Sequence, residues 1–268
     1  MKVAALQMVS GVSVQANLES ARALLEQAAR DGAELAVLPE YFCLMGLRDG
    51  DKLAAREPFG QGPIQDFLAG SARELGLWIA GGTLPLAAQD DARVRNAHLV
   101  YSPAGQCVAR YDKIHLFKFD NGREQYDESR VIESGAQPTT FDLASSDGRV
   151  WRIGLSVCYD LRFPELYRAL DADVLLVPSA FTYVTGQAHW ELLLRARAVE
   201  NLAWVVAPAQ GGIHENGRRT WGHSMVVDPW GIVLAQQEQG PGIVIAQLDA
   251  ARQARLRAQL PALEHRVL

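Results

Sequence analysis

Three residues with side chains suited to acyl-transfer chemistry stand at the ends of separate strand-like segments. Glu40 follows the run LAVLP, Lys113 lies in YDKIHLF, and Cys158 follows the run RIGLSV. A thiolate can attack a carbonyl carbon, an ammonium can stabilise the resulting oxyanion, and a carboxylate can carry protons to the leaving group and from water. The three side chains therefore supply the groups needed to hydrolyse an acyl compound through a covalent intermediate.

Each of these residue types also has an ordinary structural interpretation. A free cysteine is usually a small buried hydrophobe, and we expect that of Cys43 and Cys107. A single glutamate can be a solvated acid or a helix cap, and a single lysine usually lies on the surface. Cys158 differs because polar residues follow it and Pro164 is placed to start a helix. A helix N-terminus or the ammonium of Lys113 would lower the pKa of the thiol. Spacing alone leaves both interpretations open.

The segments that must position these residues alternate between strands and helices. Apolar runs predict strands at 2–8, 35–38, 77–81, 97–102, 106–111, 150–157, 173–177, 203–207, 224–227, 232–235 and 243–248. Helical periodicity predicts helices at 14–29, 64–75 and 187–201, another after Pro164, and a basic one near the C-terminal end. A Pro-Ala-Gly turn joins 97–102 to 106–111 as an antiparallel hairpin, so we expect mixed sheets.

Composition limits the classes of partner. The 268 residues contain no linker-like or charge-rich segment, so we expect one domain over residues 1–268. A net charge of −5 gives no electrostatic reason to bind nucleic acid or an anionic membrane, which favours a small-molecule partner. The N-terminal stretch MKVAALQMVSGVS does not resemble a signal peptide, and no apolar run is long enough to span a membrane. We therefore expect a cytoplasmic protein.

Other catalytic classes are less well supported. The three cysteines are far apart and form no C-x-x-C pair, which argues against a disulfide framework or a cysteine zinc site. A serine hydrolase needs G-x-S-x-G, but the nearest stretch ends in Cys158 and keeps Ser156 inside the strand. The six histidines show no H-E-x-x-H pattern, and the glycine pairs lack the rest of a phosphate loop. We expect no metal and no organic cofactor.

Three segments, AVLPEYF, YDKIHLF and GLSVCYDLRFPELYR, resemble in this order the glutamate, lysine and cysteine motifs of the nitrilase (carbon-nitrogen hydrolase) superfamily. The resemblance covers nearly the whole chain. It implies an α/β fold, a four-layer α-β-β-α sandwich with mixed sheets, and cofactor-free hydrolysis of non-peptide C–N bonds. It also implies that Glu40 is the general base, Lys113 the oxyanion stabiliser and Cys158 the nucleophile that forms a thioester. A second glutamate is expected beside the lysine: Glu128 in YDESR is the best match, and Glu124 is the alternative.

The same resemblance suggests how the remaining residues of the site act. The backbone N–H of Tyr159 would stabilise the oxyanion. Asp160, Arg162 and Glu165 are expected to brace the turn after the cysteine by ion pairing, although Arg162 could instead bind a substrate carboxylate. Three residues beyond the strand LLVP would line the acyl pocket or pack as an ordinary loop: Phe181, Thr182 and Tyr183.

The region after Pro178 and the terminal LPALEHR resemble the Nit branch of the superfamily, the deaminated glutathione amidases more than the ω-amidases. Such an anionic substrate requires nearby cations, for which Arg162, Arg218 and Arg219 are candidates. An ω-amidase, an N-carbamoyl amine hydrolase and a catalytically retired scaffold protein remain alternatives, but a retired site has no chemical need for all three catalytic residues. The resemblance also implies a homodimer or higher homo-oligomer, with helix 187–201 and the tail at about 260–268 in the contact.

Overall fold

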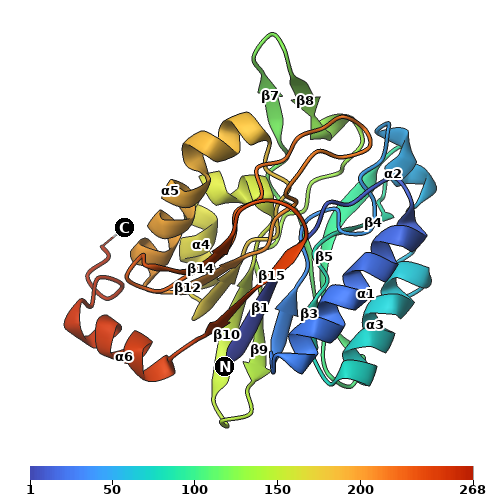
Figure 1. Ribbon diagram of the computed structural model, residues 1–268. Coiled ribbons are helices and arrows are strands. Elements are labelled where there is room, and N and C mark those ends of the chain that lie inside the picture. The colour runs from blue at the N-terminus through green and yellow to red at the C-terminus, as the bar shows by residue number, and fades with distance from the viewer. Residues whose placement is uncertain (268) are drawn as a thin grey trace.

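The computed structural model describes residues 1–267 and contains two large β-sheets flanked by helices (Figure 1). The first sheet has the order β15-β1-β2-β3-β5-β4, with β6 paired to β5. Its strands are β1 (Lys2–Gln7), β2 (Leu35–Val37), β3 (Trp78–Ala80), β4 (Leu84–Ala87), β5 (Val94–Tyr101), β6 (Cys107–Asp112) and β15 (Gly242–Gln247). The second sheet has the order β14-β13-β12-β11-β10-β9. Its strands are β9 (Thr139–Ala144), β10 (Val150–Leu155), β11 (Val174–Leu176), β12 (Trp204–Ala207), β13 (Ser224–Val227) and β14 (Val233–Gln237).

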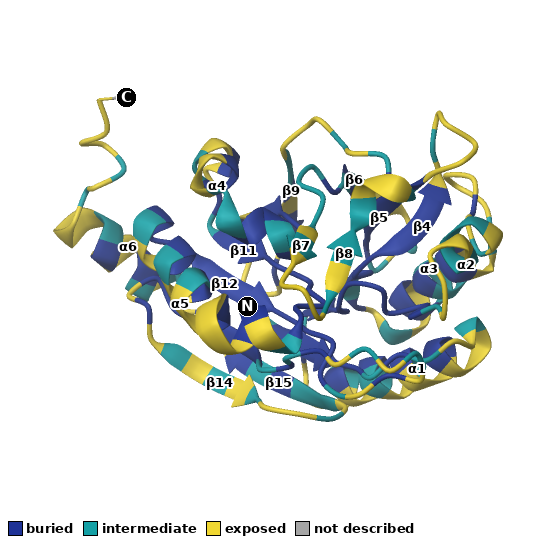
Figure 2. Cartoon of the chain, turned by 90° about the horizontal axis from the view of Figure 1, so that it is seen from above, coloured by how far each residue is buried: buried dark blue, intermediate teal, exposed yellow. Residues whose placement is uncertain are grey.

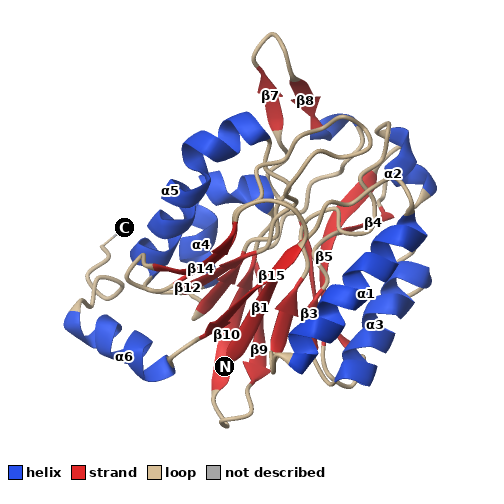
Figure 3. Ribbon diagram, in the orientation of Figure 1, coloured by secondary structure: helices blue, strands red, loops and turns tan. Residues whose placement is uncertain are grey.

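Helices cover the outer faces of both sheets (Figure 3). They are α1 (Val14–Arg30), α2 (Gly50–Ala54), α3 (Pro63–Leu75), α4 (Pro164–Leu170), α5 (Tyr183–Asn201) and α6 (Ala250–Gln259). A separate hairpin of β7 (Lys118–Asp120) and β8 (Gln125–Asp127) projects beyond the sheets in Figure 1. Figure 2 shows that the strands are largely buried and that the helices expose their outer faces.

Alternate residues of β1 belong to two different hydrophobic cores. Val3 and Ala5 pack in the core between the sheets, which also contains Trp151 of the second sheet. Ala4 and Leu6 pack instead in the core beneath α1 and α3. Because successive side chains of a strand point to opposite faces, this division requires a layer on each side of the sheet. The expected α-β-β-α sandwich is confirmed.

The pairing of the strands confirms the expected mixed sheets. β1, β2 and β3 run parallel, as do β10, β11 and β12, whereas β5 and β6 form the expected antiparallel hairpin. The predicted pairing of 224–227 with 232–235 is also present. Sequence patterns did not indicate α2, β4, β9 or the β7–β8 hairpin.

Helix α5 and the tail after α6 are the two elements expected at a subunit contact. Helix α5 begins at Tyr183 rather than at 187, because the hydroxyl of Thr182 accepts a hydrogen bond from the N–H of Thr185 and caps the helix. The tail that follows α6 is mostly exposed, and its residue 268 lies outside the described residues. Its place in a subunit contact stays a prediction.

Among residues 1–267, no helix combines the length and the apolar character needed to cross a membrane.

Candidate active site

Two carboxylates and one ammonium form a buried cluster where the loops after β2, β6 and β8 meet. Lys113 Nζ lies 2.9 Å from Glu40 Oε1 and 2.8 Å from Glu128 Oε2. The side chains of Lys113 and Glu40 are fully buried or nearly so, and that of Glu128 is 14% exposed. Three long polar side chains are thus held in one place by charge-assisted hydrogen bonds.

Glu40 is fixed by donors from three different segments. Its Oε1 accepts from Lys113 and from Asn96 Nδ2, and its Oε2 accepts from the N–H of Ala180, each at 2.9 Å. A carboxylate offers about four lone-pair sites. One site, on Oε2, therefore remains to accept a further proton.

Cys158 has an unusual backbone conformation. Its φ of 51° lies in the left-handed region, which a residue with a side chain adopts only at a cost. Its N–H donates to Pro178 O at 3.0 Å, which ties the end of β10 to the loop after β11. The N–H of Ala180, which donates to Glu40 Oε2, also stabilises the thiolate form of Cys158. The sulfur and the carboxylate are therefore grouped around one N–H.

The electrostatic environment of Cys158 corrects one expectation from the sequence. Burial and the nearby carboxylate of Glu40 raise the pKa of the thiol well above its ordinary value, and the Lys113 ammonium lowers it only in part. The N-terminus of α4 is also separated from the thiol by a 3₁₀ turn, Cys158–Arg162. The free protein therefore favours the protonated form of the Cys158 thiol.

The Lys113 ammonium and the Glu128 carboxylate hold each other in their charged forms. Burial by itself would lower the pKa of Lys113, but the carboxylates of Glu128 and Glu40 outweigh it and raise that pKa. Burial likewise opposes ionisation of Glu128, but Lys113 and the N–H of Phe117 keep its pKa below the ordinary value. The site therefore contains a permanent cation beside the thiol.

Of the two candidate second glutamates, the structure brings Glu128 to the lysine. Glu128 also accepts hydrogen bonds from the N–H of Phe117 and the hydroxyl of Tyr41, both at 2.7 Å. Glu124 lies in the turn of the β7–β8 hairpin and makes no ion pair with Lys113. Tyr41 was not singled out from the sequence, although its position directly after Glu40 was a usable signal.

The turn after Cys158 is braced by hydrogen bonds rather than by the expected ion pairs of arginine and glutamate. Asp160 Oδ2 accepts from the N–H of Val157 at 2.8 Å and from the hydroxyl of Tyr111 at 2.7 Å. Asp160 Oδ1 lies 2.7 Å from His115 Nδ1. Within residues 1–267, Arg162 and Glu165 form no ion pair.

Two residues after Cys158 lie close to each other: Tyr159, whose N–H was expected to stabilise the oxyanion, and Arg162, expected to brace the turn or to bind a substrate carboxylate. The Tyr159 N–H donates no hydrogen bond to another described residue, so it is available to an oxyanion. The guanidinium of Arg162 lies over the rings of Tyr159 and Phe181, at 5.8 and 5.9 Å from their centroids, and contacts His189 Nδ1 at 3.3 Å.

The three residues expected to line an acyl pocket or to pack as a loop lie at the start of α5: Phe181 precedes the helix, Thr182 caps it and Tyr183 is its first residue. Phe181 is buried against Trp190, and the hydroxyl of Thr182 is occupied in capping the helix. Tyr183 packs edge-on against Trp221 and is covered by the guanidinium of Arg219. Only Phe181 shares a contact, through Arg162, with the turn that carries Cys158.

A cavity of about 390 Å³ and a smaller one of about 110 Å³ adjoin this cluster. Tyr41, Lys52, Tyr126 and Arg218 line both cavities, and Glu128 lines the smaller one. Arg218 was a candidate from the sequence, whereas Lys52 was missed because it lies in the short, polar helix α2. Of the cluster, Glu128 lines the smaller cavity, and neither lining includes Glu40, Lys113 or Cys158.

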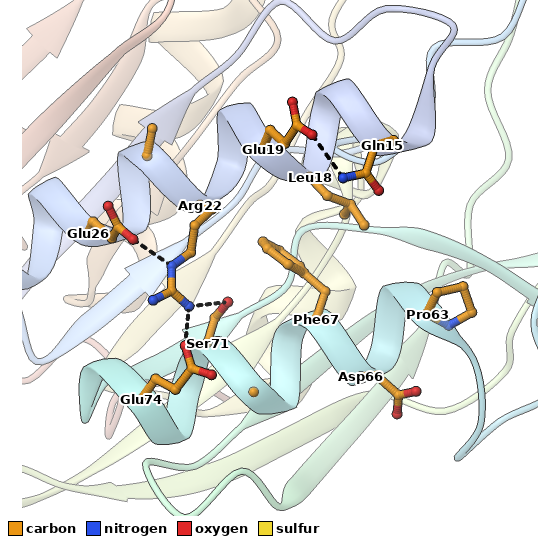
Figure 4. A pocket seen from close by; sticks show the side chains of 12 residues that line it. Gln15, Leu18, Glu19, Arg22, Glu26, Pro63, Asp66, Phe67, Ser71 and Glu74 are labelled. Atoms are coloured by element: carbon orange, nitrogen blue, oxygen red, sulfur yellow. Dashed lines mark hydrogen bonds and ion pairs between the residues drawn. The ribbon is translucent and has the colours of Figure 1, made fainter.

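A larger groove, of about 750 Å³, lies far from this chemistry between α1 and α3 (Figure 4). Arg22 of α1 forms two ion pairs there, with Glu26 of the same helix at 2.8 Å and with Glu74 of α3 at 2.7 Å. The groove contains no thiol, imidazole or lysine among its lining residues. The Arg22–Glu74 ion pair links the two helices across the groove, and the lining offers carboxylates but no nucleophile.

The other cysteines differ from each other. Cys43 is buried as expected, and burial raises the pKa of its thiol. Cys107 is exposed at the start of β6, so the expectation of a buried residue there is wrong. Residues 1–267 contain no cluster of three or more histidine, cysteine, aspartate or glutamate side chains that could hold a metal ion.

Comparison with known proteins gives one consistent result. A family model described as carbon-nitrogen hydrolase matches residues 2–258. The deaminated glutathione amidase of Synechocystis sp. is 41% identical over 270 residues, which cover 98% of this chain and 97% of that protein. The human deaminated glutathione amidase is 41% identical, with 98% of this chain and 81% of that protein covered. A CN-hydrolase superfamily protein of Xanthomonas campestris, solved with an arsenic adduct in the active site, has a TM-score of 0.86 at 29% identity and covers 100% of this chain and 97% of that one.

Proposed function

This chain belongs to the carbon-nitrogen hydrolase family, and from that premise we propose that it is a deaminated glutathione amidase. The substrate is an α-keto acid whose distal carboxyl group forms an amide with cysteinylglycine. Hydrolysis of this amide releases the keto diacid and the dipeptide. The identity of about 40% to amidases of this name, over nearly the whole chain, supports this choice of substrate.

Acylation begins with a thiol that is protonated in the free enzyme. As the sulfur of Cys158 attacks the amide carbon, its proton passes to the free lone pair of Glu40 Oε2. The negative charge that develops on the carbonyl oxygen is stabilised by the Lys113 ammonium and the Tyr159 N–H. Because the charge develops next to a fixed cation, no separate thiolate has to form first.

The two later steps return Glu40 to its starting state. The protonated Glu40 gives its proton to the amide nitrogen, the C–N bond breaks, and a thioester with Cys158 remains. Glu40 then removes a proton from a water molecule that attacks the thioester, and it passes this proton to the sulfur as the C–S bond breaks, which regenerates the Cys158 thiol and the Glu40 carboxylate. One water molecule is consumed and no oxidant or metal takes part in this scheme.

The observation that carries the proposal is the position of Glu40, in a chain with amidase relatives: its Oε1 contacts the Lys113 ammonium, and its Oε2 accepts from the Ala180 N–H, which also acts on the Cys158 thiol. The test is a release assay for keto acid, amine and ammonia. Its substrates are deaminated glutathione, the unsubstituted ω-amide of the same keto acid, N-carbamoyl amines and plain aliphatic amides. We expect the highest kcat/KM for deaminated glutathione. A preference for plain aliphatic amides would reject the substrate, and no turnover of any amide would favour a scaffold protein.

We further propose that the protein is a homodimer and cytoplasmic. Exposed apolar side chains gather where α5 meets the β13–β14 turn: Leu192, Val199, Trp230 and Ile232. Arg195 Nε donates to Gly231 O at 2.8 Å, so the helix and the turn present one continuous surface. Apolar surface of this kind favours association with a second copy. Three free cysteines, one of them exposed, suit a reducing compartment.

A further inference from the structure

Two cations in the wall of the cavities next to Glu128 lack close carboxylate partners. They are Lys52 of α2 and Arg218 of the loop between β12 and β13, and both line the 390 Å³ and the 110 Å³ cavity. Cations that lie near each other in a partly buried place repel one another and lose hydration. Such an arrangement favours an anionic ligand.

Lys52 is held mainly by packing. Its Nζ lies 4.9 Å from the centroid of the Tyr41 ring, and among residues 1–267 its only ion pair is with Asp49 Oδ1 at 3.9 Å. The lysine side chain is 18% exposed. Burial lowers the pKa of Lys52. The carboxylates of Glu128 and Asp49 oppose this effect, and the positive charge of Arg218 adds to it. A bound carboxylate would favour the charged form of the lysine.

Arg218 is similarly fixed while its charge remains uncompensated. One terminal nitrogen donates to Ala180 O at 2.8 Å, and the guanidinium lies 5.2 Å from the centroid of the Tyr126 ring. Its Nε is buried without a hydrogen-bond partner, and no carboxylate within residues 1–267 pairs with it. The group is therefore oriented by the protein but keeps donor capacity for a ligand.

The position of the cavities indicates which half of the substrate they accept. The smaller cavity begins at Glu128, whose carboxylate contacts Lys113, and the larger one extends outward from Tyr41. In the proposed mechanism Glu40 protonates the leaving nitrogen from this same buried cluster. A leaving group that is only ammonia has no use for a further 390 Å³, whereas a dipeptide does.

The wall also carries one acceptor of the right kind for a peptide. Glu124 Oε2 is buried without a hydrogen-bond partner among the described residues and lines the larger cavity. A peptide ligand brings a carboxylate, which can bind the cations Lys52 and Arg218, and N–H donors, which can bind Glu124 Oε2. The other charged residues in the wall of the larger cavity carry a net charge of +1: Arg48, Asp49 and Arg123.

We propose that Lys52 and Arg218 bind the terminal carboxylate of a dipeptide leaving group and so select substituted amides over unsubstituted ones. This inference rests on the proposed amidase function and adds a specificity site to it. Arg218 was one of three arginines considered for substrate binding. The pair with Lys52 and the assignment to the leaving group are new.

The test compares three substrates on four proteins. The substrates are deaminated glutathione, the same compound amidated at its glycine carboxylate, and the unsubstituted ω-amide, which has no leaving-group carboxylate. The proteins are the wild type, Lys52→Met, Lys52→Arg and the control Lys118→Met. Lys118 lies on the nearby hairpin, is 79% exposed and lines neither cavity. The control makes the same change of charge away from the site.

For Lys52→Met we expect kcat/KM for deaminated glutathione to fall about 10- to 100-fold, the loss typical of a hydrogen bond to a charged group. Its kcat/KM for the other two substrates should stay within about twofold, Lys52→Arg should recover part of the loss, and the control should not change. Equal losses for all three substrates would overturn the proposal, because Lys52 would then act on the catalytic carboxylates. If the wild type does not cleave deaminated glutathione, the proposed function fails. The subsite is then decided by calorimetry with cysteinylglycine and its amide, where equal affinities for wild type and Lys52→Met would overturn it.

Discussion

Tyr41 donates its hydroxyl hydrogen to Glu128 Oε1 at 2.7 Å, which joins the residue after Glu40 to the second carboxylate at Lys113. With the N–H of Phe117 and the Lys113 ammonium, Glu128 accepts from three donors. Donors of this number stabilise the ionised form of a carboxylate. Because Lys113 Nζ lies 3.0 Å from Oε1 and 2.8 Å from Oε2, each oxygen of Glu128 has two donors, so Glu128 is suited to hold the lysine charged and in place. Glu40 also accepts from three donors, but only one of them, the Ala180 N–H, lies on Oε2.

The first prediction concerns the stability that Glu128 contributes at different pH. An unfolded glutamate has a pKa of about 4.3, and Lys113 holds the pKa of folded Glu128 lower despite burial. Its contribution is therefore present above about pH 4.3 and is lost as pH falls through the lower, folded pKa. Glu128→Gln should reduce the free energy of urea unfolding at pH 7 by about 1–3 kcal/mol. As the pH falls from 5 to 3, the unfolding free energy of this variant should decrease less than that of the wild type.

The matched control for that prediction is Glu124→Gln, four residues earlier and without contact to Lys113. It should keep the acid dependence of the wild type. If Glu128→Gln instead lost stability with acid as steeply as the wild type, the carboxylate would not be the ionised partner of the lysine.

The second prediction separates the two effects of Glu40 on Cys158. Its negative charge raises the pKa of the thiol, whereas in the proposed mechanism its free lone pair accepts the proton during turnover. Glu40→Gln should therefore lower the pKa of Cys158 and speed its alkylation by iodoacetamide at pH 7 severalfold. The same change should reduce amide hydrolysis by about 10²- to 10⁴-fold, because the general base is lost.

Both measurements belong in a Cys107→Ser background, since Cys107 is exposed and would react with the reagent. In that background, one equivalent of label should abolish turnover, and Cys158→Ala should be inactive and unlabelled. A Glu40→Gln protein that reacts more slowly with iodoacetamide would mean that Glu40 already draws the proton away in the free enzyme.

The third prediction concerns the brace behind the nucleophile. Tyr111→Phe removes one of the two donors to Asp160 Oδ2 and leaves the Val157 N–H as the other. Loss of a buried hydrogen bond to a charged acceptor should cost about 1.5–3 kcal/mol in unfolding free energy. We also expect kcat to fall more than KM rises, since the turn that presents Cys158 is loosened. Tyr101→Phe, on β5 and distant from Asp160, is the control and should leave kcat unchanged.

The sequence predicts the site best where local patterns are strong. Glu40 follows a buried, continuously apolar strand, and Cys158 follows a strand whose last three residues are buried, so their position at a sheet edge was foreseeable. Lys52 lies in a five-residue helix with no buried position, and the β7–β8 hairpin is short and half-exposed. Neither element has the apolar periodicity on which such predictions depend.

The errors concern properties that depend on contacts distant in sequence. The pKa of Cys158 was expected to fall because Lys113 is a cation, but the burial of the thiol and its approach to Glu40 are set by the packing of two sheets. Cys107 was expected to be buried from its residue type alone, although it stands at the exposed start of a strand.

The fourth prediction tests the proposed homodimer. Leu192 is 67% exposed on α5, and a charge there would be buried against the second copy. Leu192→Arg should shift the mass in light scattering at micromolar concentration towards the monomer while the circular dichroism stays unchanged. Val108→Arg replaces an exposed valine on β6 and should leave the mass unchanged. A wild-type protein that is monomeric under these conditions would refute the dimer.

The fifth prediction uses a glycine that supports the loop of Glu40. Gly82 has a φ of +52°, and a Cβ at this position would overlap the backbone carbonyl of Pro39. Gly82→Ala must therefore move the backbone just before Glu40. Gly76 has a φ of +64° at the end of α3, but a Cβ there meets nothing within 4 Å, so Gly76→Ala adds only the strain of the left-handed conformation.

The two alanine variants should differ in activity as well as in stability. Left-handed strain costs about 1–2 kcal/mol, so Gly76→Ala should lose about that much unfolding free energy and keep its kcat. Gly82→Ala should lose more stability, and its kcat should fall by about 10²-fold, since a shift of about 1 Å in a catalytic group has an effect of that size. Equal kcat values for the two variants would mean that the position of Glu40 does not limit turnover, and the assignment of Glu40 as the base would then be wrong.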